Sequence, residues 1–177
     1  MMLISKEEQE QYRPNVGLMI INKKGQIWLG TRADKNKLHH ISGTLYCEQM
    51  PQGGIDIDET PLEAAYRELK EETGLSKDKV QLIRQSEYWY AYQFPHPIMF
   101  SKQSYIGQCQ KWFLFLYDGT GEDFDLMAHP EEIEFESYQW YHADEMIFKV
   151  VPFKRDVYKL VLQEFLPSIQ AITQKYK

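Results

Sequence analysis

Residues 53–75 read GGIDIDETPLEAAYRELKEETGL, and this stretch contains the signals that begin and end a helix. Thr60 is a favoured helix N-cap, the proline after it suits the first helical position, and Glu63 completes a capping box with Thr60. Gly74 is a natural C-terminal stop. The stretch therefore predicts a helix from about residue 61 to residue 73.

The predicted helix has an apolar stripe beside an acidic one. At 100° per residue, the stripe that should face the core is formed by Leu62, Ala65, Tyr66 and Leu69. Glu68, Glu71 and Glu72 share the neighbouring stripe, at spacings of three and four residues. Three carboxylates there repel one another, and a bound divalent cation would remove that cost. Because carboxylate oxygens are hard ligands, the pattern favours Mg²⁺ or Mn²⁺.

A positive side chain stands among these carboxylates. Arg67 is one turn from Glu63 and from Glu71, so its guanidinium can hold either carboxylate. Taken alone, such a helix is more often an ordinary solvated surface helix with salt bridges. Here Gly53, Glu59 and Arg67 also stand at fixed offsets from the carboxylates, and this combination favours a functional site.

The same stretch resembles the Nudix box at every fixed position. Those positions are Gly53, Glu59, Arg67, Glu68, Leu69, Glu71, Glu72, Gly74 and Leu75. The chain is thus similar to Nudix hydrolases, and the resemblance implies metal-dependent hydrolysis of a diphosphate bond in a nucleoside diphosphate linked to another group. It also implies the Nudix fold, an α/β/α sandwich in which a mixed β-sheet lies between helices.

Composition narrows the class of protein further. With 177 residues, 43% of them hydrophobic and 14% aromatic, the chain fits one folded domain, residues 1–177, in which residues 1–11 form a loose N-terminal segment. The net charge of −6 excludes a generic nucleic-acid binder that works through nonspecific electrostatics, because such a protein would be basic. No DNA partner is expected, and RNA would have to be bound locally through its phosphates, with the help of metal.

The cysteines and the apolar runs indicate a cytoplasmic protein. Cys47 and Cys109 are the two cysteines, and reduced thiols are the default for so few. Residues 1–14 lack an apolar core of signal-peptide length, and no apolar run approaches the roughly 18 residues of a membrane-spanning helix. We therefore expect no membrane association and a cytoplasmic location.

Periodicity and turn signals predict the remaining elements. We expect strands at residues 15–22, 27–32, 80–94, 111–117 and 134–141, with one or two strands within 80–94. Further helices are expected at residues 143–151 and 153–166, with Pro167 interrupting or kinking the second. Loops are expected at residues 33–48 and 95–108. Strands mixed with a few helices fit the α/β sandwich that the Nudix box implies.

Stretches outside the box look like one subgroup. They are YRPNVG at residues 12–17, MPQGGI at 50–55, GQCQKWF at 107–113 and PFKRDVY at 152–158. Together they resemble bacterial RNA pyrophosphohydrolases, a group also described as dinucleoside polyphosphate hydrolases. The resemblance implies removal of pyrophosphate, or of successive phosphates, from the 5′-triphosphate or 5′-diphosphate end of RNA, a step in mRNA decay. Two alternatives are a hydrolase of diadenosine tetra- or pentaphosphate and a noncatalytic Nudix module, although such modules usually lack box carboxylates.

The resemblance also implies a metal and catalytic set. Its metal ligands would be the carbonyl of Gly53 and the carboxylates of Glu68, Glu71, Glu72 and Glu134. Either Glu72 or Glu71 would activate water as general base, and Arg67 would complete the catalytic set with Glu68. For Glu134, the alternative is an ordinary exposed carboxylate on a strand.

Four further residues would contact the substrate if the resemblance holds. Arg13 and Arg32 would bind the 5′ phosphates, and Phe153 and Lys154 would border the cleft that takes a base. The alternatives are a solvated charge for Lys154 and a core side chain for Phe153. Aromatic residues near the cleft are also candidates to stack a base, although most should be core. They are Tyr88, Trp89, Tyr90 and Tyr92.

The chain departs from the subgroup at three places. Residues 33–48 are longer than the usual link, and Glu48 stands where a tryptophan is typical, which leaves the preferred base or cap open. Cys109 replaces a residue that is usually basic, which removes one phosphate contact. The histidine pair at residues 39–40 and Cys47 match no standard zinc spacing, which favours a surface loop over a transition-metal site.

Overall fold

The computed structural model describes residues 10–33, 39–41, 44–100 and 103–177. Its central sheet has the strand order β5-β2-β1-β8-β7, with β6 also paired to β1 and β9 to β2. The strands are β1 (Tyr12–Ile21), β2 (Ile27–Arg32), β5 (Glu48–Gln49), β6 (Gln52–Gly54), β7 (Val80–Phe100), β8 (Gln103–Tyr117) and β9 (Phe135–Tyr141). β1 and β8 run parallel and the other pairs are antiparallel, so the sheet is mixed as expected.

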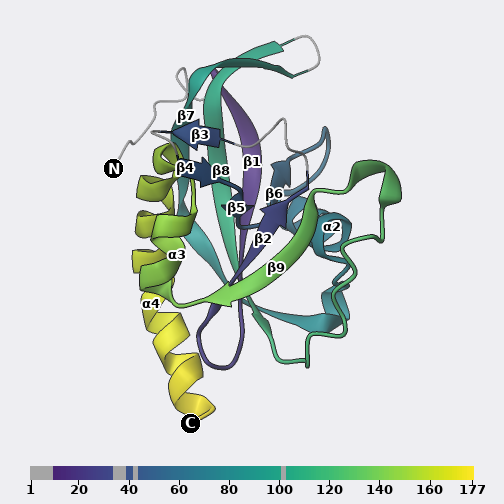
Figure 1. Cartoon of the computed structure of the whole chain (residues 1–177), viewed down its shortest axis with the longest axis vertical. Helices are drawn as coiled ribbons and strands as arrows, with labels where there is room; N and C mark the ends of the chain where they lie inside the picture. The colour runs from purple at the N-terminus through teal and green to yellow at the C-terminus, as the bar shows by residue number, and fades with distance from the viewer. Residues whose placement is uncertain (1–9, 34–38, 42–43, 101–102) are drawn as a thin grey trace.

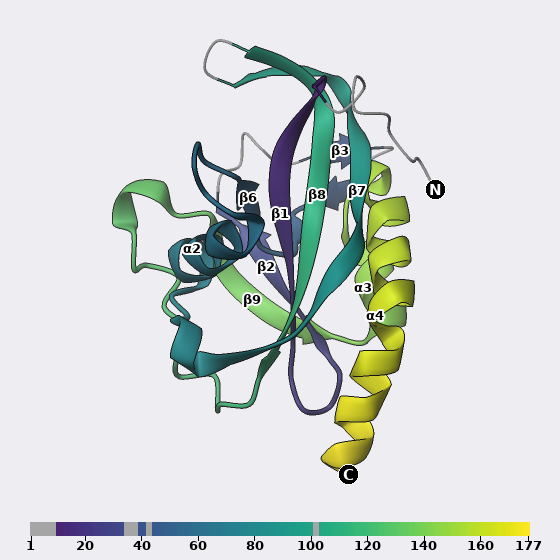
Figure 2. The ribbon, with the colours of Figure 1, turned by 180° about the vertical axis from the view of Figure 1, so that it is seen from behind.

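Helices cover both faces of this sheet (Figures 1 and 2). Helix α2 (Pro61–Thr73) lies on one face, while α3 (Ala143–Lys149) and α4 (Arg155–Lys175) lie on the other. Strand alternation divides the core accordingly: Leu18 and Ile20 pack on the α2 side, and Met19 and Ile21 pack on the α4 side. The expected α/β/α sandwich is confirmed. Short 3₁₀ turns complete the chain at η2 (Lys77–Lys79), η3 (Pro130–Glu132) and η4 (Pro152–Lys154).

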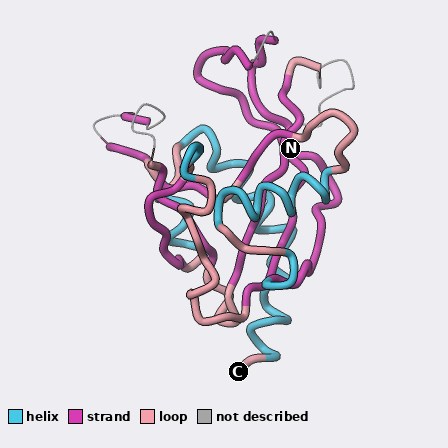
Figure 3. Tube along the Cα trace, turned by 90° about the vertical axis from the view of Figure 1, so that its right-hand side faces the viewer, coloured by secondary structure: helices cyan, strands magenta, loops and turns pink. Residues whose placement is uncertain are grey.

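The prediction of a loop at residues 95–108 is wrong. β7 and β8 form one long antiparallel ladder that continues to the pair Phe100–Gln103, and Figure 3 shows it extending beyond the rest of the sheet. Pro95 and Pro97 are tolerated because β7 lies at the end of the strand order and its pairing is irregular between residues 93 and 98.

The prediction of a loop at residues 33–48 is also wrong in part. β3 (His39–Ile41) and β4 (Thr44–Tyr46) form a separate two-stranded sheet, and β5 joins the central sheet beside β2. Residues 34–38 and 42–43 lie outside the described part of the chain. β3 and β4 pair with each other and β5 pairs with β2, and the local composition of this polar segment does not reveal either pairing.

The remaining elements lie close to their expected positions. β2 matches its prediction, β1 begins at Tyr12 rather than Asn15, and α3 ends at Lys149. Contrary to expectation, α4 continues through Pro167, because Ile169 beyond it is buried and packs close to the β1–β2 turn. Among the helices of the described residues, none combines the length and the apolarity that crossing a membrane requires.

Candidate active site

Helix α2 begins and ends where local sequence signals place it. The Thr60 side chain accepts a hydrogen bond from the Glu63 amide at 3.3 Å, and the Glu63 carboxylate accepts one from the Thr60 amide at 2.8 Å. Gly74 has φ of 75°, the left-handed conformation that favours glycine, and its N–H donates to the Lys70 carbonyl. These caps fix the start and register of the helix, and with them the directions of its carboxylates.

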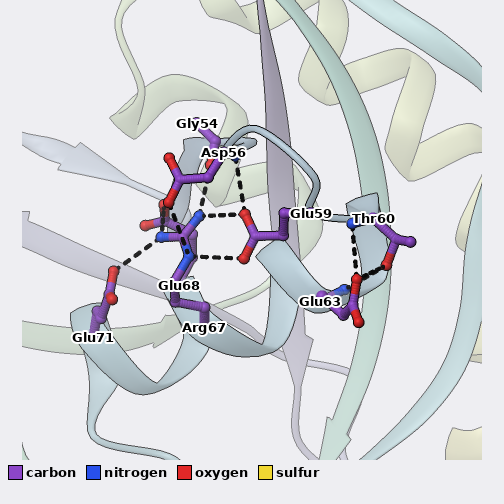
Figure 4. A network of polar contacts seen from close by, with 8 residues as sticks. All are labelled: Gly54, Asp56, Glu59, Thr60, Glu63, Arg67, Glu68 and Glu71. Atoms are coloured by element: carbon purple, nitrogen blue, oxygen red, sulfur yellow. Dashed lines mark hydrogen bonds and ion pairs between the residues drawn. The ribbon is translucent and has the colours of Figure 1, made fainter.

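Arg67 lies at the centre of a polar network on this helix (Figure 4). Its guanidinium donates to Glu59 at 2.8 and 2.9 Å, to Glu68 at 2.7 Å and to Glu71 at 3.1 Å. It also donates to the Gly54 carbonyl at 2.8 Å, which joins the helix to β6. We call Arg67, Glu59, Glu68 and Glu71 the Arg67 network. Five donors in a planar fork suit such multiple pairing.

The predicted partner Glu63 is not among these contacts. The Glu63 carboxylate accepts hydrogen bonds from Thr60 in the capping box and is therefore not available to Arg67. Within the network, the hydrogen bond from Arg67 holds the pKa of Glu59 below its usual value. Burial has the larger effect at Glu68 and raises its pKa, although Arg67 opposes this.

The main chain of β6 approaches the helix closely at Gly53. A Cβ atom there would lie 1.8 to 2.1 Å from the carboxyl atoms of Glu68, so only glycine fits beside this side chain. At the next residue, a Cβ on Gly54 would meet the Arg13 guanidinium at 2.3 Å, which places Arg13 beside the same strand. Arg13 also acts on Glu68 electrostatically and lowers its pKa slightly against the effect of burial.

Glu72, on α2, is close enough to two other carboxylates, Glu68 and Glu134, for their charges to act on it. Its Oε2 atom accepts a hydrogen bond from the main-chain N–H of Gln52 at 2.9 Å. Burial raises the pKa of Glu72 well above its usual value, and the charges of Glu134 and Glu68 raise it further. The site therefore concentrates negative charge at Glu72 that nearby cations offset only in part.

Glu134 comes from a distant part of the chain, immediately before β9. Its Oε1 atom forms an ion pair with Arg32 Nη1 at 2.9 Å and accepts a hydrogen bond from Gln49 Nε2 at 3.3 Å. Both side chains of the ion pair are largely buried, which argues against the exposed-carboxylate alternative. Arg32 Nε is buried and finds no hydrogen-bond partner within the described residues.

Lys154 is buried, so the alternative of a solvated charge is wrong. Its Nζ atom donates to Gln49 Oε1 at 2.9 Å and to Gln52 Oε1 at 3.1 Å, and it lies 5.5 Å from the centre of the Tyr92 ring. Burial lowers the pKa of Lys154 to about 7, and the charge of Arg32 contributes in the same direction.

The sequence analysis did not predict the side-chain amides around Lys154. We call them the carboxamide cluster: Asn15, Gln49, Gln52, Gln108 and Gln110. Gln52 donates to Gln108 at 3.1 Å, and Gln110 donates to Asn15 at 2.7 Å. Asn15 Nδ2 and Gln110 Oε1 are buried and have no partner among the described residues. Every member lies in or beside a stretch that resembles the subgroup, and that position was the signal available in the sequence.

Aromatic residues divide between this region and the surface. Tyr92 is buried, donates to Gln108 and lies 5.8 Å from the half-buried Phe153 ring, so Phe153 both joins the core and lies near Lys154. Tyr90 donates to Glu164, a contact with α4 at 2.6 Å. The other two stacking candidates, Tyr88 and Trp89, are exposed.

The structure shows the surroundings of the residues at which the chain departs from the subgroup. Glu48 accepts a hydrogen bond from the Tyr141 hydroxyl at 2.7 Å, whereas the next residue, Gln49, contacts Glu134 and Lys154. Successive strand residues point to opposite faces, so Glu48 does not enter the carboxamide cluster. Cys47 and Cys109 are free thiols. The side chains of residues 39–40 lie outside the description.

The chemistry of the acidic residues suits a hard divalent cation. Oxygen donors are available from Gly53, Glu68, Glu71, Glu72 and Glu134, and the pKa of Glu72 is raised first by burial and then by the charges of Glu134 and Glu68, which a cation would offset. The close approach of Gly53 to Glu68 also brings a main-chain segment against the carboxylates. Among the described residues, no three His, Cys, Asp or Glu side chains already form a metal-binding group, and Arg67 holds two of the carboxylates.

Comparisons with known proteins show the family to which the chain is related. Residues 11–161 match the family model described as NUDIX domain. The chain is 40% identical over 160 residues to an RNA pyrophosphohydrolase of Cereibacter sphaeroides (strain KD131), covering 89% of this chain and 93% of the relative. It is 36% identical over 166 residues to an RNA pyrophosphohydrolase of Wolbachia sp. subsp. Brugia malayi (strain TRS), covering 93% of this chain and 96% of the relative.

Solved structures show the same fold at low identity. An Ap4A hydrolase of C. elegans in a binary complex aligns with a TM-score of 0.58 at 18% identity, covering 87% of this chain and 98% of that one. The E. coli dihydroneopterin triphosphate pyrophosphohydrolase aligns with a TM-score of 0.59 at 16% identity, covering 84% and 95%. At such identities the likeness concerns the fold alone.

Proposed function

The chain belongs to the Nudix hydrolase family, and on that basis we propose that it is an RNA pyrophosphohydrolase. It would remove pyrophosphate, or successive phosphates, from the 5′-triphosphate or 5′-diphosphate end of RNA in the cytoplasm. The observation that carries this proposal is the similarity to RNA pyrophosphohydrolases, at 36 to 40% identity over about nine-tenths of the chain.

The acidic side of the site would hold Mg²⁺ or Mn²⁺. We assign the ligands to the Gly53 carbonyl and to the carboxylates of Glu68, Glu71, Glu72 and Glu134. A divalent ion bound there supplies Lewis acidity and offsets the charge of the phosphates. Arg67 orients Glu68 and Glu71, as its hydrogen bonds to both indicate.

Proton transfer is the task of a carboxylate. We propose that Glu72, with Glu71 as the alternative, takes a proton from the attacking water. Glu72 lies beside the carboxylates of Glu68 and Glu134, whose charges act on it, so it is placed to take that proton. Its hydrogen bond from the Gln52 main chain fixes one carboxylate oxygen while the water is activated.

Cationic and aromatic side chains would bind the remainder of the substrate. Arg13, beside Gly54, and Arg32, paired with Glu134, are placed near the carboxylates and would contact the 5′ phosphates. Phe153 and Lys154 would border the place of a base, near the buried Tyr92. Binding through these few groups is compatible with a net charge of −6, because contact is concentrated at the phosphates.

A direct comparison of substrates tests the proposal. Initial rates would be measured with 5′-triphosphorylated RNA, 5′-diphosphorylated RNA, capped RNA and diadenosine tetraphosphate, each with Mg²⁺ and each with a chelator as control. We expect the highest kcat/KM with one of the uncapped 5′-phosphorylated RNAs and no turnover with the chelator. A large preference for the dinucleotide would reject RNA as the substrate, and absence of turnover with all four would reject the enzyme.

A further inference from the structure

Gln49 joins the two sides of the site through a single side chain. We propose that Gln49 is a positioning residue whose carboxamide holds Glu134 with its nitrogen and Lys154 with its oxygen, so that acid and ammonium keep a fixed relation. The roles of Glu134 and Lys154 rest on the proposed function, whereas their hydrogen bonds to Gln49 are observed in the structure. Nothing in the Nudix box itself includes Gln49.

The orientation of this amide follows from the chemistry of its neighbours. Gln49 Nε2 donates to Glu134 Oε1 at 3.3 Å, and Gln49 Oε1 accepts from Lys154 Nζ at 2.9 Å. A carboxylate can only accept and an ammonium can only donate, so the opposite orientation of the amide would lose both hydrogen bonds. The side chain is 4% exposed, so water cannot easily replace either partner.

The main chain on both sides of Gln49 is held firmly. Gln49 lies opposite Gly30 in the pairing of β5 with β2. The N–H of the next residue, Met50, donates to the buried hydroxyl of Tyr158 at 3.2 Å, which comes from α4. The amide is therefore positioned before any substrate arrives, and its conformational freedom is lost in folding rather than in binding.

A neutral side chain suits this position better than a charged one. Lys154 receives two amide oxygens, from Gln49 and Gln52, and no carboxylate within the described residues forms an ion pair with it. Amide oxygens bind an ammonium group without cancelling its charge, which leaves that charge available to an anionic substrate. A carboxylate at position 49 would instead pair with Lys154 and repel Glu134.

Two substitutions of Gln49 test its contacts with Glu134 and Lys154. Q49M keeps the length of the side chain and removes both hydrogen bonds. Q49E keeps an oxygen for Lys154 but replaces the donor to Glu134 with a repelling carboxylate. We therefore expect Q49M to lower kcat and raise KM, each by about tenfold, from the loss of hydrogen bonds to charged groups. We expect Q49E to lower kcat at least as much and to raise KM by at least about tenfold, because its carboxylate would neutralise Lys154 as well as repel Glu134.

A third readout does not depend on turnover. Mn²⁺ affinity would be measured by electron paramagnetic resonance for the wild type, Q49M and Q110M. Loss of a group that orients a ligand typically weakens metal affinity about 10- to 100-fold, so Q49M should bind Mn²⁺ more weakly. Q110M is the matched control, because Gln110 is an equally buried amide whose hydrogen bonds go to Asn15 and Gln52 instead. Its Mn²⁺ affinity should stay within about twofold of the wild type.

The outcomes distinguish a positioning role from a structural one. Thermal melting shows whether each variant is folded, and Q49E is the variant to interpret if Q49M is not. Wild-type kcat, KM and Mn²⁺ affinity in a folded Q49M would overturn the proposal, as would wild-type kcat and KM in Q49E. If the wild type prefers diadenosine tetraphosphate, RNA fails as the substrate, yet the same ratios measured with the dinucleotide still decide the role of Gln49.

Discussion

The Arg67 network and the carboxamide cluster hold a cation in opposite ways. Arg67 is surrounded by the carboxylates of Glu59, Glu68 and Glu71, and its pKa is raised, first by hydrogen bonding to Glu59. Lys154 is surrounded by amides and an aromatic ring, and burial lowers its pKa to about 7. Opposite charges stabilise a cation by neutralising it, whereas neutral dipoles hold it and leave its charge uncancelled.

The difference assigns separate tasks to the two regions. In the proposed function, Arg67 would keep together carboxylates that otherwise repel one another, so that its network organises groups for a metal ion. In the carboxamide cluster, the cation itself would be the group presented to the substrate. Two carboxylates are hydrogen-bonded to members of the carboxamide cluster: Glu72 accepts from the main-chain N–H of Gln52, and Glu134 accepts from the side chain of Gln49.

The largest effect is expected where the two regions meet, at Glu72. E72Q should lower kcat by about 10²- to 10⁴-fold, because the amide cannot take the proton of the attacking water. The fold should persist, since the amide oxygen can still accept from the Gln52 main chain. Steady-state rates with 5′-triphosphorylated RNA measure the effect, and E71Q is the comparison. A larger loss of kcat in E71Q would identify Glu71 as the general base, and a wild-type rate in E72Q would show that Glu72 is not the general base.

The second effect concerns the strand that separates the two regions. G53A should destabilise the protein by about 1–3 kcal/mol and lower kcat by at least about tenfold, because the added Cβ displaces the Glu68 carboxylate. Urea unfolding and steady-state kinetics measure the two changes. G54A is the control, because its Cβ meets only the flexible end of Arg13. Equal behaviour of the two variants would contradict the close approach at Gly53.

The third effect tests whether charge neutralisation stabilises the Arg67 network. R67M should lower the free energy of unfolding by about 1–3 kcal/mol, because Glu68 is left buried with its charge unpaired. R67K should recover less than half of this loss, since an ammonium group cannot make the forked contacts to Glu59 and Glu71 together. Urea unfolding compares the three proteins. Full recovery by lysine would show that charge alone suffices.

The smallest effect tests whether burial of the charged form of Lys154 lowers the free energy of unfolding. Its pKa is lower in the folded protein than in the unfolded chain, so between pH 7 and 10.5 the unfolded chain binds more protons and the free energy of unfolding rises with pH. Below pH 7 both states are protonated and the cost is fully present. K154M should lack this rise, which we expect to be about 1–2 kcal/mol between pH 6 and pH 8. Parallel curves for the wild type and K154M in urea unfolding would refute the lowered pKa.

The two regions also differ in how well the sequence predicted them. Helix α2 was predicted from residue 61 to residue 73 and has those bounds, because Thr60, Glu63 and Gly74 act over a few residues. The contact of Arg67 with Glu71 was predicted for the same reason. The burial of Lys154 was not, because a lysine after a proline-containing turn is normally exposed and its acceptors lie 102 and 105 residues away in the sequence.

Nonlocal pairing accounts for the other errors. Prolines within residues 95–108 indicate a loop by their local preference, yet the two strands pair again beyond the irregular stretch at residues 93–98. At residues 131–136 several glutamates made the position of the relevant one uncertain. The ion pair with Arg32, on β2, identifies Glu134 as the carboxylate that faces the site.

The sequence by itself determined the Nudix family, the capped helix and its row of carboxylates, because these depend on residues that are close together along the chain. The tertiary structure alone decided that Asn15, Gln49, Gln52, Gln108 and Gln110 gather around Lys154 or beside its partners. Amides carry no net charge and have no periodicity of their own, so no local pattern marks them. Their function depends on which distant donors and acceptors the folded sheet brings within hydrogen-bonding distance.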